Sequence, residues 1–183
     1  MMGSGKSTVA RLLSGALGWR AVDTDQLVEG EAGKTVAEIF EQDGEEEFRA
    51  AEALAIASVG RTGGPLVVSV GGGAVLSGAN RRAMRELGTV VWLRARPATL
   101  AERVGTGQGR PLLSADRQGL AGPMGPVGTV EALLRLDSER RALYAEVADL
   151  VVDVDDLSPS EVARRVADAL ADVNAGPAGA RPG

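Results

Sequence analysis

The sequence Gly3-Ser4-Gly5-Lys6-Ser7-Thr8 stands near the start of the chain and leads directly into apolar residues at helical spacing, from Val9 to Leu17. It matches the second half of the phosphate-binding pattern GxxxxGK[ST]. In such a loop, backbone N–H groups point at phosphate oxygens, the lysine reaches the β- and γ-phosphates, and the next hydroxyl binds Mg²⁺. The nucleotide-binding residues predicted here are Gly3, Ser4, Gly5, Lys6, Ser7 and Thr8. The alternative is a glycine- and serine-rich chain end that contains a lysine by chance.

The first half of this pattern lies outside the sequence. The pattern needs a glycine six positions before Lys6, which places it before Met1. The hydrophobic strand that delivers the chain into such a loop is also missing, although in doubly wound folds this strand is usually central. We therefore expect the natural protein to begin upstream of Met1, and the sheet of this chain to lack its first strand.

Strand-like and helical stretches alternate along the rest of the chain. Leu66 to Val70 is a continuous apolar run of strand length, which is typical of a strand buried on both faces. The other expected strands are Trp19–Val22, Thr89–Leu93 and Leu150–Val154. The expected helices after the first are Val36–Phe40, Phe48–Val59, Asn80–Leu87, Ala98–Val104, Glu131–Val147 and Ser158–Val173, the last with a capping box from Ser158 to Glu161. This alternation predicts an α/β protein of the P-loop NTPase type, with three layers, α/β/α, around a parallel sheet.

Length and composition indicate one domain. The chain has 183 residues, and domains average roughly 150. We expect a single domain over residues 1–174. The tail, residues 175–183, is rich in Gly, Ala and Pro and is expected to be flexible. Residues 114–129, with several glycines and prolines, form a second loose stretch.

Composition also excludes several kinds of function. The chain contains neither cysteine nor histidine, so thiol and imidazole chemistry and thiolate metal sites are excluded. The net charge of −5 disfavours nonspecific binding of nucleic acid, whose phosphates repel an acidic surface. No apolar run reaches the roughly 20 residues that a bilayer demands, and no secretory signal is present. We expect a cytoplasmic protein without nucleic-acid or membrane partners.

Two acids follow the first visible strand, in the sequence Asp23-Thr24-Asp25. They lie at the carboxyl end of the strand, where open α/β sheets bind ligands. Because alternate strand residues point the same way, Asp23 and Asp25 are expected to face one site. Taken alone, the pattern is more typical of an ordinary acidic turn. The phosphate-binding loop shortly before it favours a functional role.

At this point the sequence resembles the shikimate kinase family, and the resemblance covers nearly the whole chain apart from its ends. Besides GSGKST and DTD it rests on four motifs: Phe48-Arg49-Ala50-Ala51-Glu52, Gly71-Gly72-Gly73-Ala74-Val75, Arg110-Pro111-Leu112-Leu113 and Glu139-Arg140-Arg141-Ala142-Leu143-Tyr144. It implies transfer of a phosphoryl group from ATP to the 3-hydroxyl of shikimate, giving shikimate 3-phosphate on the route to chorismate and the aromatic amino acids. It also implies ATP and Mg²⁺ as cofactors, and we expect a monomer.

The resemblance assigns roles to residues across the chain. Lys6, Asp25 and Arg110 are implied as catalytic, with Asp25 accepting a hydrogen bond from the attacking hydroxyl and Arg110 on a lid over approximately residues 105–130. Shikimate would be bound by Asp25, Arg49, Gly71, Gly72, Gly73 and Arg140, between the sheet and a helical flap. Mg²⁺ would be held by Ser7 and Asp23. The adenine ring would lie between Arg103 and Pro159, with Arg110 also contacting ATP.

Physical chemistry agrees with the assignment of the arginines, because a planar guanidinium makes paired bonds to a carboxylate that lysine cannot reproduce. Glu52, three residues after Arg49 on one helical face, is expected to hold that arginine in place. The alternative is a solvated ion pair worth about 0.2–0.5 kcal/mol.

Some features leave the function open. Residues 121–129 look like an insertion in the lid. Another small-molecule kinase, such as a gluconate kinase, would share the loop and the acids but not this set of arginines and glycines. A nucleotide-binding module without turnover is a third reading, because the phosphate-binding pattern is incomplete.

Overall fold

The computed structural model describes residues 1–104 and 126–175, with side chains described over 1–104 and 129–172. In chain order its elements are α1 (Lys6–Leu17), β1 (Arg20–Asp23), α2 (Thr24–Ala32), α3 (Val36–Gln42), α4 (Gly44–Val59), β2 (Leu66–Ser69), the 3₁₀ helix η1 (Ala74–Leu76), α5 (Gly78–Leu87), β3 (Val91–Arg94), α6 (Pro97–Val104), α8 (Pro126–Val147), β4 (Leu150–Asp153) and α9 (Pro159–Ala175). The expected strands agree with the observed ones to within two residues at either end.

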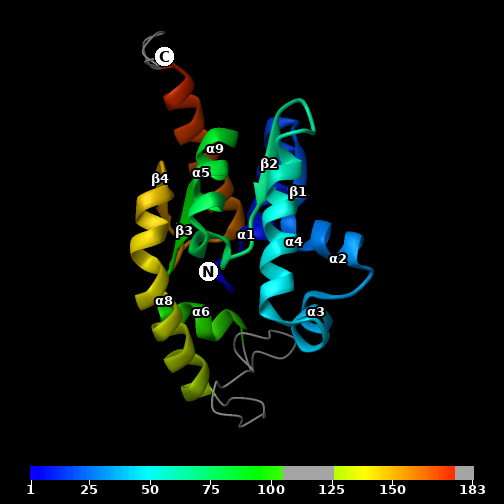
Figure 1. Ribbon diagram of the computed structural model, residues 1–183. Helices are drawn as coiled ribbons and strands as arrows, with labels where there is room; N and C mark the ends of the chain where they lie inside the picture. Colours follow the sequence, from blue (N-terminus) through cyan, green and yellow to red (C-terminus); the bar gives the residue numbers. More distant parts are fainter. Residues whose placement is uncertain (105–125, 176–183) are drawn as a thin grey trace.

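The strands in the described part of the chain pair in two parallel couples. β1 pairs with β2, placing Val22 opposite Val68, and β3 pairs with β4, placing Trp92 opposite Val151. The parallel arrangement predicted from the alternation of helices and strands is confirmed. The two couples do not join into one sheet, and the N-terminus lies between them (Figure 1).

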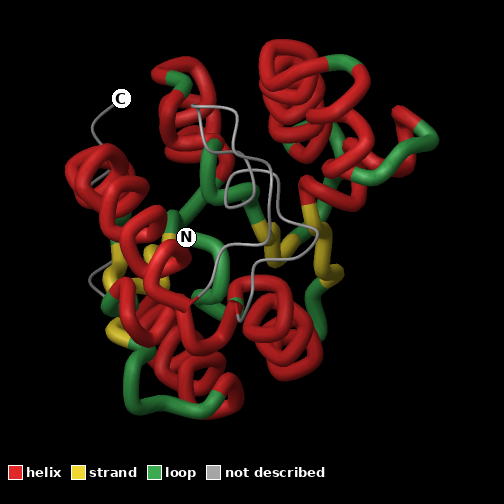
Figure 2. The backbone as a smooth tube through the Cα atoms, turned by 90° about the horizontal axis from the view of Figure 1, so that it is seen from below, coloured by secondary structure: helices red, strands yellow, loops and turns green. Residues whose placement is uncertain are grey.

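Helices cover both faces of the strands, which gives the three expected layers (Figures 1 and 2). On one face α1 packs against α9 and β2, and on the other α5 contacts α4 and α8. The main core lies between these layers. A second, smaller cluster joins α2, α3 and α4 and consists of Val28, Ile39, Phe48 and Ala55. These three helices therefore form a small helical lobe beside β1 and β2.

Helix α2 was not expected from the sequence. Of its residues only Thr24 and Val28 are buried, so its apolar pattern is too weak to predict a helix. The helix is fixed instead by its first residues, because the Asp23 carboxylate caps it by accepting a hydrogen bond from the N–H of Asp25 (3.0 Å).

The capping box predicted for the last helix is confirmed. The Glu161 carboxylate accepts from the N–H of Ser158 (2.8 Å), and the Ser158 hydroxyl accepts from the N–H of Glu161 (3.3 Å).

The prediction of a loose stretch over residues 114–129 is wrong at its C-terminal end. Helix α8 begins at Pro126, so residues 126–129, including part of the expected insertion, belong to a helix. Proline is favoured at a first helical position, where its missing N–H costs nothing. Residues 105–125, including Arg110 and most of the expected lid, lie outside the described residues, as do residues 176–183 of the expected tail.

Strand β2 is less buried than its sequence predicts. Leu66, Val67 and Val68 are only partly buried, and Ser69 alone is fully buried. A continuous apolar run predicts burial on both faces, but among the described residues β2 pairs only with β1, and its other edge borders an open space. Among the described helices, none combines the length and the apolar character needed to cross a membrane.

Candidate active site

The phosphate-binding loop has the backbone that its sequence requires. Gly3 (φ 76°) and Gly5 (φ 83°) both adopt the left-handed conformation, which side chains disfavour. A Cβ at Gly3 would also lie 2.9 Å from the carbonyl oxygen of Leu100. Gly5 caps α1, its carbonyl accepting from the N–H of Val9 (2.9 Å). The loop thus ends at the N-terminus of a 12-residue helix, where the macrodipole and free N–H groups favour an anion.

The two predicted metal ligands are in direct contact. The Ser7 hydroxyl donates a 2.8 Å hydrogen bond to the Asp23 carboxylate and lies 3.3 Å from the hydroxyl of Ser69, at the carboxyl end of β2. A hydroxyl and a carboxylate are hard oxygen donors, and Mg²⁺ is commonly held by one or two such groups together with water and phosphate oxygens. The donor set therefore fits Mg²⁺ next to a bound triphosphate.

Asp25 lies in the first turn of α2 rather than on the strand, which corrects the expectation that it faces the site by strand alternation. Helical geometry still places it at the site: Lys6 is close enough to influence its charge, and so are Asp23 and Arg49. Burial raises the pKa of the Asp25 carboxyl above its ordinary value, and Lys6 only partly offsets that rise. A carboxylate with a raised pKa is a better proton acceptor than an exposed aspartate.

The three glycines after β2 are explained by close approach. Gly73 has φ −87°, a backbone conformation that any residue adopts. A Cβ at Gly73, however, would collide with the guanidinium of Arg49, and one at Gly71 would collide with the carboxylate of Glu52 and lie 2.9 Å from Oδ1 of Asp25. The side chains of α2 and α4 therefore pack against the backbone of the glycine turn, Gly71 to Gly73.

Arg49 is held from several sides. Its guanidinium donates to the carboxylate of Glu52 (2.9 Å) and to that of Glu45 (3.1 Å), and it lies over the rings of Phe48 and Phe40, 5.2 and 6.0 Å from their centroids. Glu52 is 1% exposed, so the solvated ion pair offered by the sequence does not describe this contact. Burial raises the pKa of the Glu52 carboxyl, with Arg49 acting in the opposite direction.

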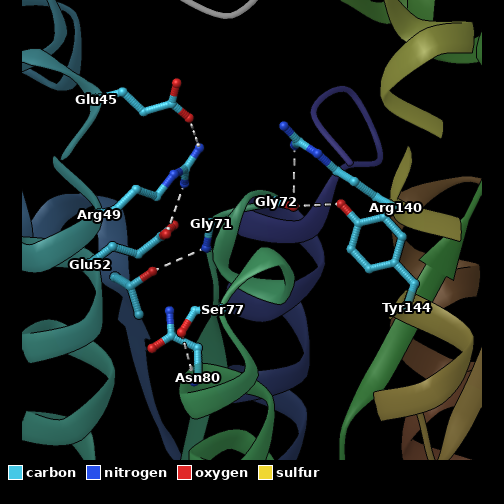
Figure 3. Close-up of polar contacts among 10 residues, drawn as sticks. Glu45, Arg49, Glu52, Gly71, Gly72, Ser77, Asn80, Arg140 and Tyr144 are labelled. Atoms are coloured by element: carbon cyan, nitrogen blue, oxygen red, sulfur yellow. Dashed lines mark hydrogen bonds and ion pairs between the residues drawn. The ribbon is translucent and has the colours of Figure 1, made fainter. Parts of the chain in front are cut away.

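Arg140 comes from α8, on the opposite side of the glycine turn from Arg49 (Figure 3). Its side chain is buried and one guanidinium N–H donates to the carbonyl of Gly72 at 3.4 Å. The Tyr144 hydroxyl donates to the same carbonyl at 2.6 Å. The structure thus brings together Asp25, Arg49 and Arg140 around the turn.

Two buried side-chain atoms in the described part of the chain have no hydrogen-bond partner, and both belong to this site. They are Oε1 of Glu52, an acceptor, and Nε of Arg140, a donor. Buried polar atoms are nearly always satisfied, and leaving one unpaired costs about 1–3 kcal/mol. The site is therefore arranged for a polar ligand.

A pocket of about 130 Å³ adjoins the phosphate-binding loop. It is lined by Ser4 and Gly5 of the loop and by Arg103 and Pro159. The Arg103 guanidinium donates to the carbonyl of Val154 at 2.7 Å, which fixes its plane at the pocket wall. The two residues expected beside an adenine ring are thus brought together with the loop.

Sequence reasoning missed three residues that shape the site. Thr24 is completely buried and its hydroxyl accepts from the N–H of Gly71 (3.1 Å); the others are Ser69 and Tyr144. A partial signal existed for Tyr144, because it lies four residues after Arg140, on the same helical face. No local pattern predicts the role of Thr24, because its hydrogen-bond partner, Gly71, is 47 positions away in the sequence.

A glycine-rich loop that opens a helix, with parallel strands under helices on both faces and acids at the strand ends, defines a P-loop nucleotide-binding protein. A family described as shikimate kinase matches residues 2–171. The chain belongs to the shikimate kinase family.

Individual relatives agree with this membership. The chain is 43% identical over 169 residues to a shikimate kinase of Moorella thermoacetica, covering 92% of this chain and 90% of that protein. It is 44% identical over 173 residues to a shikimate kinase of Symbiobacterium thermophilum, covering 93% and 92%. The fold is similar to that of shikimate kinase from Acinetobacter baumannii in complex with shikimate, with a TM-score of 0.84 at 28% identity, covering 94% of this chain and 89% of that one.

Proposed function

We propose that this protein is a shikimate kinase, which transfers the γ-phosphoryl group of ATP to the 3-hydroxyl of shikimate. The observation that carries the proposal is the pair of unpartnered buried atoms beside the glycine turn, Oε1 of Glu52 and Nε of Arg140. A small acid that also bears hydroxyl groups supplies what both atoms lack: a carboxylate for the arginine and a hydroxyl for the glutamate.

Substrate binding would rest on the two arginines. Arg49 and Arg140 would bind the carboxylate of shikimate through charge-assisted hydrogen bonds. Gly71, Gly72 and Gly73, which carry no side chains, would let the ring of the substrate approach the backbone. Tyr144 would keep the turn in place through its hydrogen bond to Gly72.

Phosphoryl transfer would use the loop and the acids. The Lys6 ammonium and the N–H groups from Gly3 to Thr8 would bind the β- and γ-phosphates. Asp25 would accept the proton of the 3-hydroxyl as its oxygen attacks the γ-phosphorus and ADP leaves. Mg²⁺, held by Ser7 and Asp23, would neutralise charge on the phosphate oxygens. Arg110 would contribute a further positive charge from the lid.

The remaining assignments are proposals of the same kind. Arg103 and Pro159 would hold the adenine ring in the 130 Å³ pocket. We propose a single kinase domain over residues 1–174 and a cytoplasmic monomer without nucleic-acid or membrane partners.

A coupled assay of ADP release tests the function. The protein is given ATP, Mg²⁺ and either shikimate or gluconate, and the phosphorylated product is identified by phosphorus NMR. We expect ADP release that depends on shikimate and a product phosphorylated at the 3-hydroxyl. A preference for gluconate, or ATP binding without any shikimate-dependent release, would overturn the proposal in favour of another small-molecule kinase or of a non-catalytic nucleotide-binding protein.

A further inference from the structure

Two donors from α8 converge on one backbone oxygen, the carbonyl of Gly72 (Figure 3). The Tyr144 hydroxyl donates to it at 2.6 Å, and a guanidinium N–H of Arg140 donates to it at 3.4 Å. The two side chains are four residues apart, so they lie on the same face of the helix. A neutral donor and a charged donor therefore share one acceptor in the glycine turn.

The distances rank these two hydrogen bonds. O–H···O bonds span about 2.5–3.0 Å and N–H···O bonds about 2.7–3.2 Å, with charged donors at the short end. The neutral hydroxyl of Tyr144 thus makes a short bond, whereas the bond from the Arg140 guanidinium is longer than the usual range. This order is the reverse of the intrinsic one, because a charged donor forms the stronger hydrogen bond. The arginine is therefore only weakly tied to the backbone.

The Arg140 guanidinium keeps donors that are not used by the protein. Its side chain is 4% exposed, and among the described residues its Nε has no hydrogen-bond partner. Buried polar atoms are nearly always paired, and a guanidinium with uncommitted N–H groups can bind a carboxylate through two parallel bonds. The long bond to Gly72 and the unpaired Nε therefore describe one state, in which the guanidinium is buried and still available to a ligand.

Packing fixes the position of the Tyr144 hydroxyl. The side chain is buried, and its ring stacks on that of Trp92 in β3, with the centroids 5.5 Å apart and an angle of 26° between the planes. A buried tyrosine hydroxyl needs a hydrogen-bond partner, and it has one proton to donate. Burial raises the pKa of the Tyr144 phenol, which keeps that proton on the oxygen. The hydroxyl is thus a neutral donor held in place against the Gly72 carbonyl.

We propose that Tyr144 is a positioning residue for substrate binding: its hydroxyl occupies the Gly72 carbonyl and so keeps the Arg140 guanidinium available for the carboxylate of the substrate. This role rests on the proposed function, which supplies the carboxylate. Without the hydroxyl, a guanidinium N–H would close on the carbonyl in a short, charge-assisted bond. The substrate would then bind only by breaking that bond, so its affinity would fall.

The effect is confined to the binding of shikimate. Tyr144 comes from α8, whereas the residues proposed to bind phosphate and Mg²⁺ come from α1 and β1. Asp25, the proposed proton acceptor, approaches the glycine turn from α2. Loss of the Tyr144 hydroxyl should therefore change the KM for shikimate and leave kcat and the KM for ATP as they are.

Tyr144→Phe tests the proposal, because it removes the hydroxyl and keeps the ring that stacks on Trp92. We expect the KM for shikimate to rise about 10- to 100-fold, with kcat and the KM for ATP within about twofold of wild type. Val152→Ala, at a buried position of β4, is the control for lost stability. It should lower the thermal midpoint by about 5 °C and leave the KM for shikimate unchanged. If Tyr144→Fhe behaved like this control, the proposal would be wrong.

A double-mutant cycle tests whether Tyr144 acts through Arg140. The quantity compared is kcat/KM for shikimate, which is measurable even when binding is weak. In an Arg140→Met background no guanidinium can close on the Gly72 carbonyl, so Tyr144→Phe should lower kcat/KM less than about twofold. An equally large effect in both backgrounds would show that the hydroxyl supports the turn itself, and would overturn the proposal.

A crystal structure of Tyr144→Phe without ligands gives a readout that needs neither ATP nor shikimate. We expect the bond from Arg140 to the Gly72 carbonyl to shorten from 3.4 Å to about 2.9 Å. An unchanged distance would contradict the proposal even if the KM rose. A shortened bond in a protein whose wild type does not phosphorylate shikimate would count against the proposed function alone, and would support the same role of Tyr144 towards another carboxylate.

Discussion

Glu52 accepts a 2.9 Å hydrogen bond from the Arg49 guanidinium although its own side chain is only 1% exposed. Glu45 contacts the same guanidinium at 3.1 Å but is 49% exposed. The two glutamates share a partner and differ in burial, so they form a matched pair for testing how Arg49 is positioned.

We expect Glu52→Gln to raise the KM for shikimate about 10-fold, equivalent to roughly 1.4 kcal/mol, and to leave the KM for ATP unchanged. The reason is that the buried charge on Glu52 fixes the guanidinium plane, whereas an exposed pair is worth only about 0.3–0.5 kcal/mol. Glu45→Gln should therefore change the KM for shikimate less than about twofold. Steady-state kinetics of both variants decides this, and equal effects of the two would refute the positioning role.

Lys6→Ala and Asp25→Asn should abolish phosphoryl transfer while the fold is retained. Lys6 is expected to stabilise the transferred charge, and Asp25 to receive the proton of the hydroxyl, a contribution of about 10²–10⁴-fold in general-base catalysis. Circular dichroism and the thermal midpoint check the fold, and the ADP assay checks activity. Undiminished turnover in either variant would contradict the assignment.

The raised pKa of Asp25 predicts the pH dependence of kcat/KM. As a proton acceptor Asp25 works only when ionised, so activity should fall on the acidic side, through a pKa above the ordinary aspartate value of 3.8. Burial is the main cause of that rise. Because the pKa of Glu52 is also raised, its titration would give a limb in the same direction, so the profile is repeated with Glu52→Gln. A limb that vanishes in this variant would assign it to Glu52 instead.

Much of the fold and site was accessible from the sequence because the signals are local. The phosphate-binding loop, the apolar strands and the caps are set by neighbouring residues. The helix α2 was missed because Val28 is its only buried apolar residue. The structural reason for three glycines in a row was also missed. Glu52 and Arg49, which lie on α4 and are distant from the glycines in the sequence, occupy the space that side chains would need.

Gly73→Ala should therefore weaken shikimate binding without strain in the backbone. Its new methyl group would collide with the guanidinium of Arg49 and displace it from Glu52. We expect a KM for shikimate raised at least about 10-fold with the KM for ATP unchanged. Gly15→Ala in α1, which meets nothing within 4 Å, is the control. It should stabilise the protein by about 0.5–1 kcal/mol and leave both constants as they are.

Finally, the Met1 amine should make the stability of this chain depend on pH between about 5 and 8. Because burial lowers the folded-state pKa of the amine from 8.0 to about 5, the unfolded state binds more protons in that range. The free energy of unfolding therefore rises with pH, by up to about 1.4 kcal/mol per unit, and levels off above pH 8. Asp25 and Glu52 act oppositely, since their raised pKa values give stability that is present at low pH and lost as pH rises through the folded-state value.

Urea unfolding from pH 5 to 8 separates these contributions when the chain is compared with its N-terminally acetylated form, in which only the amine is neutralised. The difference in unfolding free energy between the two forms should be largest near pH 5 and disappear towards pH 8. A difference independent of pH would show that the amine is solvated in the folded state, and that Met1 does not lie buried between the two strand couples.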